Sequence, residues 1–186
     1  MNAMSFFPAF AISFLLANHI VAQSAPTRHE AGLQFSGVNF KGDNTFNVLY
    51  KKAVDEMRYR RFRAAFGSLN VVYVGKELQS VIEAGIFFGV EKRRKAGEKL
   101  VFFDGWELGA DITHFNDNRD NSRWITGLGI GYVLGLQHEF NDRWAMNIET
   151  VPGVKTKLEK TTGRDVYASF SVGFSSLASL AIVRKF

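Results

Sequence analysis

Apolar and polar residues alternate along residues 166–186, the end of the chain, with the period of a β-strand. The odd-numbered positions are small or polar over much of this length. A strand with two such faces separates two environments, so we expect the even-numbered positions to face an apolar one. Counting back in twos from Phe186 gives mostly apolar side chains: Ile182, Leu180, Ala178, Phe174, Val172, Phe170, Ala168 and Val166.

The length of this segment leaves two interpretations open. As one strand, tilted by about 45°, it would rise roughly 50 Å, about twice the apolar band of an outer membrane. Its upper half would then project beyond the hydrocarbon. The alternative is a tight hairpin at Ser175-Ser176. That hairpin would add a strand and move every turn of the chain to the opposite side of the membrane.

Seven further alternating segments precede it, and turn-forming residues separate them. In the fifth, Asp104 falls on the apolar phase, which predicts a bulge at Asp104-Gly105. We interpret residues 70–77, 91–98, 116–122 and 155–164 as connections, although Val71 to Val74 are apolar enough to prolong a neighbouring strand. The segments cover about residues 31–41, 46–52, 58–68, 79–90, 100–112, 123–138 and 144–153.

The turns alternate in character along the chain. Short turns near Asp55, Lys95 and Asp142 follow the even-numbered strands, and most longer or more polar connections follow the odd-numbered ones. Outer-membrane barrels have short turns on the periplasmic side, longer loops outside, and an even number of strands. The sequence therefore predicts an all-β fold, a transmembrane antiparallel up-and-down β-barrel of eight strands.

The two phases differ too strongly for a soluble barrel of the lipocalin type, in which the apolar residues face inward around a ligand. One phase gathers Phe, Trp, Ile, Leu, Val and Tyr, and the other gathers Gly, Ser and charged residues. Charges inside so narrow a barrel must pair. We expect a structural charge network in the lumen, centred on Arg61 and Arg63 with Glu83 and Glu107. The charged lumen residues are Arg61, Arg63, Glu83, Glu107, Asp111 and Glu149.

Composition indicates where the protein is located and which partners and sites are excluded. Residues 1–22 contain an apolar stretch that predicts a cleaved secretory signal peptide and export through the Sec pathway, leaving residues 23–186 as one barrel domain. The chain has no cysteine, which excludes disulfides, thiolate metal sites and lipoprotein acylation. The net charge is +5. Nucleic acid is not an expected partner, because the basic residues lie beside apolar alternation.

The chain resembles the small outer-membrane β-barrels common in Bacteroidetes-type bacteria and, more loosely, the eight-stranded OmpA/OmpX-like barrels. The residues that carry this resemblance are the turn from Phe140 to Trp144, the glycine-rich alternation from Gly129 to Gly135, and the terminal Lys185-Phe186. The resemblance implies a Gram-negative outer-membrane location and contact with outer-membrane lipids and lipopolysaccharide. It also implies insertion by the barrel-assembly machinery, with Phe186 as part of the assembly signal.

Candidate catalytic residues are few. His114, His138 and Ser122 invite comparison with eight-stranded lipid A deacylases, which use a His and a Ser near the membrane surface, but no local motif matches. Acidic turn residues such as Asp117, Asp120 and Asp142 usually serve turns rather than metals. We therefore expect no catalytic, cofactor or metal site, and a monomer with a structural or surface-interaction role. The alternatives are a lipid-modifying enzyme and narrow small-solute transport.

Overall fold

The computed structural model describes residues 29–36, 45–67, 70–74, 77–117 and 121–186. The predicted signal peptide lies outside them. Among the described residues, no helix is long and apolar enough to cross a membrane. These residues form nine β-strands: β1 (His29–Ser36), β2 (Thr45–Ala53), β3 (Arg58–Phe66), β4 (Asn70–Val74), β5 (Glu77–Lys95), β6 (Leu100–Asp117), β7 (Asn121–Glu139), β8 (Trp144–Thr161) and β9 (Tyr167–Lys185).

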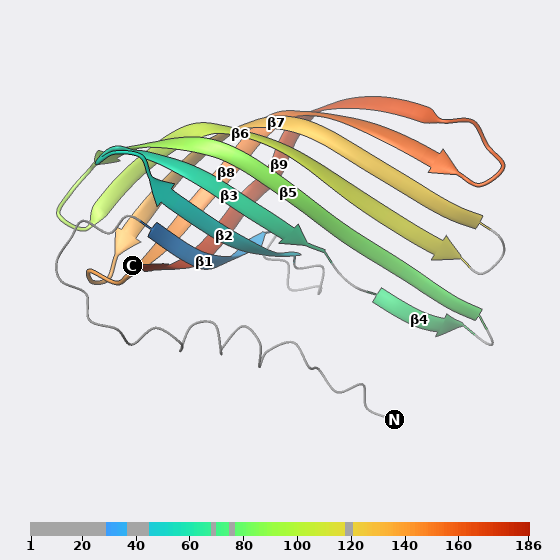
Figure 1. Ribbon diagram of the computed structural model, residues 1–186, viewed down its shortest axis with the longest axis horizontal. Coiled ribbons are helices and arrows are strands. Elements are labelled where there is room, and N and C mark those ends of the chain that lie inside the picture. The colour runs from blue at the N-terminus through green and yellow to red at the C-terminus, as the bar shows by residue number, and fades with distance from the viewer. Residues whose placement is uncertain (1–28, 37–44, 68–69, 75–76, 118–120) are drawn as a thin grey trace.

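Eight of these strands close into a ring. The sheet runs in the order β3-β2-β1-β9-β8-β7-β6-β5-β4, and an additional pairing of β3 with β5 closes it (Figure 1). All pairings in the sheet are antiparallel, and the first strand pairs with the last, from Glu30 opposite Lys185 to Ser36 opposite Ser179. The predicted all-β, eight-stranded up-and-down barrel is confirmed.

The ninth strand is a continuation rather than an extra wall segment. Both β3 and β4 pair with β5: β3 with the stretch from Ala84 to Lys92, and β4 with the stretch from Glu77 to Val81. β3 and β4 are thus consecutive pieces of one strand position in the ring. The apolar Val71 to Val74, which the sequence allowed as a prolongation, form most of β4.

The alternation of faces follows the sequence pattern. In β3 the odd-numbered Tyr59, Arg61 and Arg63 are buried, whereas Arg58 and Arg60 are exposed. The large exposed apolar side chains form a belt around the outside of the barrel. We call it the apolar belt; its members include Phe88, Val90, Trp106, Leu108 and Leu128.

The two ends of the barrel differ. One end carries three tight connections, closed by backbone hydrogen bonds from Val54 N–H to the Arg58 carbonyl, from Ala96 N–H to the Leu100 carbonyl, and from Phe140 N–H to the Trp144 carbonyl. The first and last described residues, His29 and Phe186, also pair there through two backbone hydrogen bonds. We call this the turn end and the opposite end the loop end. Strands β5 to β9 run well past β1 to β3 toward the loop end (Figure 1).

The last strand is one continuous element, β9, and the alternative hairpin at Ser175-Ser176 is wrong. Its partner β8 continues through Pro152 to Thr161, although the sequence pattern fades there and predicted a loop over residues 155–164. The register shifts between Glu149 and Val151 and between Val151 and Pro152. Proline lacks a backbone N–H for the ladder and is tolerated at such irregularities, so the strand passes it rather than ending.

Two other local predictions are wrong. The charged segment at residues 91–98 is a turn only in part, because β5 continues to Lys95. There is no bulge at Asp104-Gly105: the two residues pair in unbroken register with Leu134 and Val133. Asp104 is accommodated on the outer face because it accepts hydrogen bonds from the Arg94 guanidinium and the Tyr132 hydroxyl, at 2.7 Å each.

Candidate functional site

The turn-end half of the lumen holds a compact set of charged side chains from six strands. It contains four carboxylates and four cations, and no member is more than 7% exposed. We call this set the luminal cluster; it consists of Glu30, Lys51, Arg61, Arg63, Glu91, Arg93, Glu107 and Glu149.

Arg61 is the centre of the luminal cluster. Its Nη2 and Nη1 atoms donate to the two carboxylate oxygens of Glu149, at 2.7 and 3.2 Å. The Arg61 guanidinium also lies 3.2 Å from Glu107 through Nε and 3.5 Å from Glu91 through Nη1. In the ring order, β3 and β8 are opposite each other, so the pair of Arg61 and Glu149 spans the barrel. A planar guanidinium that presents five donors suits several carboxylates at once, and a lysine would not replace it.

A second group lies closer to the turn end. The Arg93 guanidinium forms a bidentate pair with Glu30, two contacts of 2.7 Å, and reaches Glu91 through Nε at 2.7 Å. Lys51 donates to the other oxygen of Glu91 at 2.5 Å. Glu91 is therefore shared between this group and Arg61, which joins the two groups into one connected network.

Aromatic rings and glycines fill the space around these charges. The Arg63 guanidinium lies 3.8 Å from the centre of the Phe87 ring, and the Lys51 ammonium lies 4.4 Å from the centre of the Phe103 ring. Gly109 and Gly135 leave room for these rings, because a Cβ at either position would overlap Phe87 or Phe103. Any side chain at these two positions would displace a ring that packs against a cation.

Neutral polar groups complete part of the network. The Gln34 amide donates to Glu149 at 2.7 Å and to the Ser179 hydroxyl at 2.8 Å. Gln137 and Asn147, which are paired across β7 and β8, are fully buried, and their amides have no hydrogen-bond partner among the described residues. This part of the lumen is therefore less well satisfied than the charged part.

The structure brings four of the six predicted lumen residues together. Arg61, Arg63, Glu107 and Glu149 belong to the luminal cluster, and Arg63 pairs with Glu107 through two donors. Glu83 lies elsewhere: it is half-buried, pairs with Thr113 in β6, and adjoins Gly67. Asp111 lies in the loop-end half, where Lys155 contacts it at 2.5 Å.

Sequence reasoning missed the other members of the luminal cluster. The composition of residues 91–98 predicts a charged turn that includes Glu91 and Arg93. Glu30 falls before the first predicted strand. Lys51 is on the polar phase of its predicted strand but is not among the expected lumen charges. The signal for two of them is present in the sequence. Glu91 and Arg93 continue the odd-numbered phase of Gly85 and Gly89, which is the lumen phase of β5.

A polar pair lies on the outer face near the loop end. The His114 imidazole Nε2 lies 3.0 Å from the Ser122 hydroxyl, and the Trp124 ring stacks on His114 with their centroids 3.9 Å apart. His138 is far from them, near the turn end, opposite Leu100. The structure therefore brings together His114 and Ser122 from the sequence comparison and leaves His138 out.

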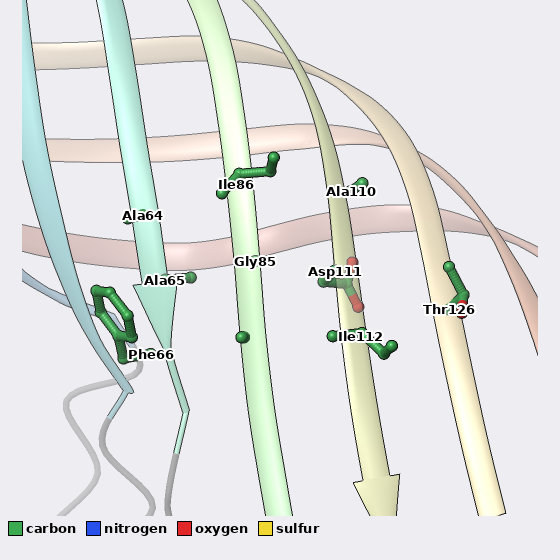
Figure 2. A pocket seen from close by; sticks show the side chains of 10 residues that line it. Ala64, Ala65, Phe66, Gly85, Ile86, Ala110, Asp111, Ile112 and Thr126 are labelled. Carbon is green, nitrogen blue, oxygen red and sulfur yellow. The ribbon is translucent and has the colours of Figure 1, made fainter.

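Below this pair lies a shallow groove of about 310 Å³ in the outer face of β3, β5, β6 and β7 (Figure 2). Small side chains, Ala64, Ala84 and Ala110, make the hollow. Ile112 and Thr126, which line it, are each two residues along their strands from His114 and Trp124. The groove and the polar pair are therefore roughly 7 Å apart along the strands.

Comparison with known proteins gives little guidance. No protein-family model matches the sequence, and no curated protein matches it. Among solved structures, the barrel is similar to a major outer membrane protein from Thermus thermophilus, with 10% identity and a TM-score of 0.48 over 85% of this chain and 99% of that one.

Proposed function

We propose that this chain is an outer-membrane β-barrel with a closed polar lumen and a structural or surface-interaction role. The observation that carries the proposal is an inverted distribution of burial. Lys51 and Arg61 are at most 2% exposed, whereas Leu108 and Leu128 are 64% and 59% exposed. In water this arrangement would expose a continuous apolar surface, but in a bilayer the apolar belt would contact lipid.

The luminal cluster argues against a pore. Eight strands leave an interior just wide enough to be filled by side chains. Here the pair of Arg61 and Glu149 crosses that interior, and the neighbouring rings of Phe87 and Phe103 pack against Arg63 and Lys51. Continuous transport of solutes would require these pairs to separate. We therefore favour the structural role over a transport role.

Orientation follows from the two ends. Tight turns face the periplasm in outer-membrane barrels, so the turn end would lie there and the loop end would face outward. Residues Tyr167 to Gly173 of β9 include exposed side chains on both phases, which suits a part of the barrel that stands clear of the hydrocarbon. This projecting part is the surface offered to partners outside the cell.

The remaining expectations belong to the same proposal. Export would use the Sec pathway, and the barrel-assembly machinery would insert the chain with the β9 end, including Phe186, as its assembly signal. The outer lipid contacts would include lipopolysaccharide at the loop end. We propose a monomer, of the kind found among the small barrels of Bacteroidetes-type bacteria.

The test is membrane fractionation of cells that express the full chain, combined with N-terminal sequencing. We expect recovery in the outer-membrane fraction and a mature N-terminus near Gln23. Purified protein should insert into planar bilayers without stepwise conductance. Recovery as a soluble periplasmic protein would overturn the proposal, and regular conductance steps would replace the closed lumen with a transport role.

A second candidate function, hydrolysis of lipid acyl esters, is favoured by His114 and Ser122. His114 Nε2 is within hydrogen-bond distance of the Ser122 oxygen, which is the geometry in which an imidazole accepts a proton from an attacking hydroxyl. The Ser122 oxygen would form an acyl ester as the alcohol of the lipid departs with that proton, and water would then release the fatty acid. The groove below the pair is apolar and would accept an acyl chain.

This candidate is tested by incubating the reconstituted barrel with phospholipid or lipopolysaccharide and measuring released fatty acid by mass spectrometry. Catalysis by this pair would be abolished in Ser122→Ala and retained in Ser169→Ala, a serine of β9 outside the site. Absence of release by the unmodified protein, or equal release by both variants, would leave the structural role alone.

A further inference from the structure

The outer surface at the turn end carries an unusual concentration of positive charge. We call the four cations on β2, β3 and β5 the basic rim patch; they are Lys52, Arg58, Arg60 and Lys92. All four are exposed and lie on the outward phase of their strands, because their neighbours Lys51, Tyr59, Arg61 and Glu91 are buried.

Within the basic rim patch, like charges face each other across the strand pairs. Lys52 lies directly opposite Arg60, and Arg58 lies directly opposite Lys92. Directly opposed like charges destabilise a sheet unless something neutralises them. An anion bound between the strands would therefore stabilise these two pairs.

The carboxylates beside the patch are already engaged. Asp55 contacts the Arg58 Nε at 2.5 Å, and Asp104 accepts from Arg94 and Tyr132. Among the described residues, Lys52, Arg60 and Lys92 have no ion-pair partner. Lys92 lies opposite Asp104 across β5 and β6, but that carboxylate is held by Arg94 and Tyr132. These three cations are therefore available to an external anion.

The surroundings define what kind of anion fits. Arg60 is paired with Val90, and Val90 with Trp106, both of which are more than half exposed members of the apolar belt. A groove of about 410 Å³ runs over this junction; its lining includes the cations Arg58, Arg60 and Lys92, the carboxylate Asp104, and Val90, Trp106 and Tyr132. An anion bound here must carry an apolar body that continues along the belt.

We propose that the basic rim patch binds the phosphodiester headgroup of an anionic phospholipid of the periplasmic leaflet. Arg and Lys donors meet the phosphate oxygens in charge-assisted hydrogen bonds, and the acyl chains lie along Val90 and Trp106. The indole of Trp106 stands at the level between headgroup and hydrocarbon, where amphipathic rings are favoured. The site rests on the proposed membrane insertion with the turn end in the periplasm.

The test uses the full mature chain in mixed vesicles of phosphatidylcholine and phosphatidylglycerol, with native mass spectrometry of the lipids that stay bound after extraction. The unmodified protein should retain phosphatidylglycerol in preference to phosphatidylcholine, and high salt should remove the preference. Arg60→Gln with Lys92→Gln should weaken retention by roughly fivefold for each cation removed.

The matched control is Lys157→Gln with Lys160→Gln, which removes the same charge from exposed positions of β8 at the loop end. This variant should keep the preference. Arg60→Lys with Lys92→Arg, which preserves the charge, should also keep most of the preference for phosphatidylglycerol. This variant controls for a folding defect caused by substitution at the two positions. Equal retention of the two lipids by the unmodified protein, or equal losses in patch and control variants, would overturn the site. Failure to insert into either vesicle would instead overturn the proposed function.

Discussion

The two halves of the lumen hold similar ion pairs in very different surroundings. In the turn-end half, the Arg61 side chain is 0% exposed and meets carboxylates from three strands. In the loop-end half, Lys155 and Asp111 form a pair of 2.5 Å with side chains 34% and 23% exposed. The same kind of contact is therefore part of a closed interior at one end and of a solvated wall at the other.

The difference arises from the lengths of the strands. The ring includes β1, β2 and β3 only near the turn end, where they pair with the final part of β9 and the final part of β5. The register of β8 and β9 shifts at Glu149 and Pro152, close to the upper limit of the luminal cluster. The turn-end half should therefore carry most of the stability.

Arg61→Met is the strongest test of the difference between the two halves of the lumen. Removal of Arg61 leaves Glu149 buried without a cationic partner, whereas Glu107 keeps Arg63. An uncompensated buried charge costs on the order of 3–5 kcal/mol of unfolding free energy. Adding Glu149→Gln to this variant should recover part of the loss. Urea unfolding in lipid vesicles measures both, and equal losses in the single and double variants would show that the pairing does not matter.

The second test concerns the outer face of β9. Leu180→Arg places a cation near the midplane of the hydrocarbon if Phe186 marks the periplasmic rim, and should cost about 2–4 kcal/mol. Val172→Arg, higher on the same strand where the native side chain is 74% exposed, should cost little because that part projects beyond the bilayer. Comparable penalties in vesicle unfolding would contradict the projection of the loop-end half.

Lys155→Met is the loop-end counterpart of Arg61→Met. Because Lys155 and Asp111 are both partly exposed, solvent screens the pair, and its loss should cost no more than about 1 kcal/mol. The measurement is again the unfolding free energy in vesicles. A loss as large as that of Arg61→Met would mean that the loop-end lumen is as closed as the turn end.

The sequence alone was sufficient for the strand count and for the assignment of faces. Both depend on a local signal, the alternation of apolar and polar residues, which the ring of eight strands preserves. It also placed Arg61, Arg63, Glu107 and Glu149 on the lumen phase of the barrel, where charges are tolerated only when they pair. The alternation did not predict which lumen charges would group in the turn-end half, since Glu83 and Asp111 lie on the same phase but outside the luminal cluster.

The errors have physical causes. Charges at the end of a strand have the same composition as a polar turn, so the sequence pattern assigns Glu91 and Arg93 to a connection although they are buried. Pro152 and Gly153 are strand breakers in isolation, but a register shift lets β8 continue. No local pattern reports which residues meet across the lumen, so the contact between Arg61 in β3 and Glu149 in β8 required the closed ring.

The smallest effect is expected at the tight turns of the turn end. Two of these turns have matched hydrogen bonds, but in one turn a carboxylate accepts them and in the other an amide does. Asp55 accepts hydrogen bonds from the backbone N–H groups of Met57 and Arg58, at 2.9 and 2.8 Å. Asn141 accepts from the equivalent N–H groups of Arg143 and Trp144, at 2.9 Å each. Of these two accepting side chains, only Asp55 is ionisable.

The hydrogen bond from the Met57 backbone, followed by that from the Arg58 side chain, lowers the pKa of Asp55 below its ordinary value of 3.8. A lowered pKa means that the carboxylate stabilises the folded state above pH 3.8, and that this contribution is lost as pH falls through the lowered value. Asp55→Asn should keep the turn and remove this acid dependence, whereas Asn141→Asp should introduce one. NMR titration of the Met57 and Arg143 amides distinguishes the two turns, and an unchanged acid response in Asp55→Asn would assign it to another group.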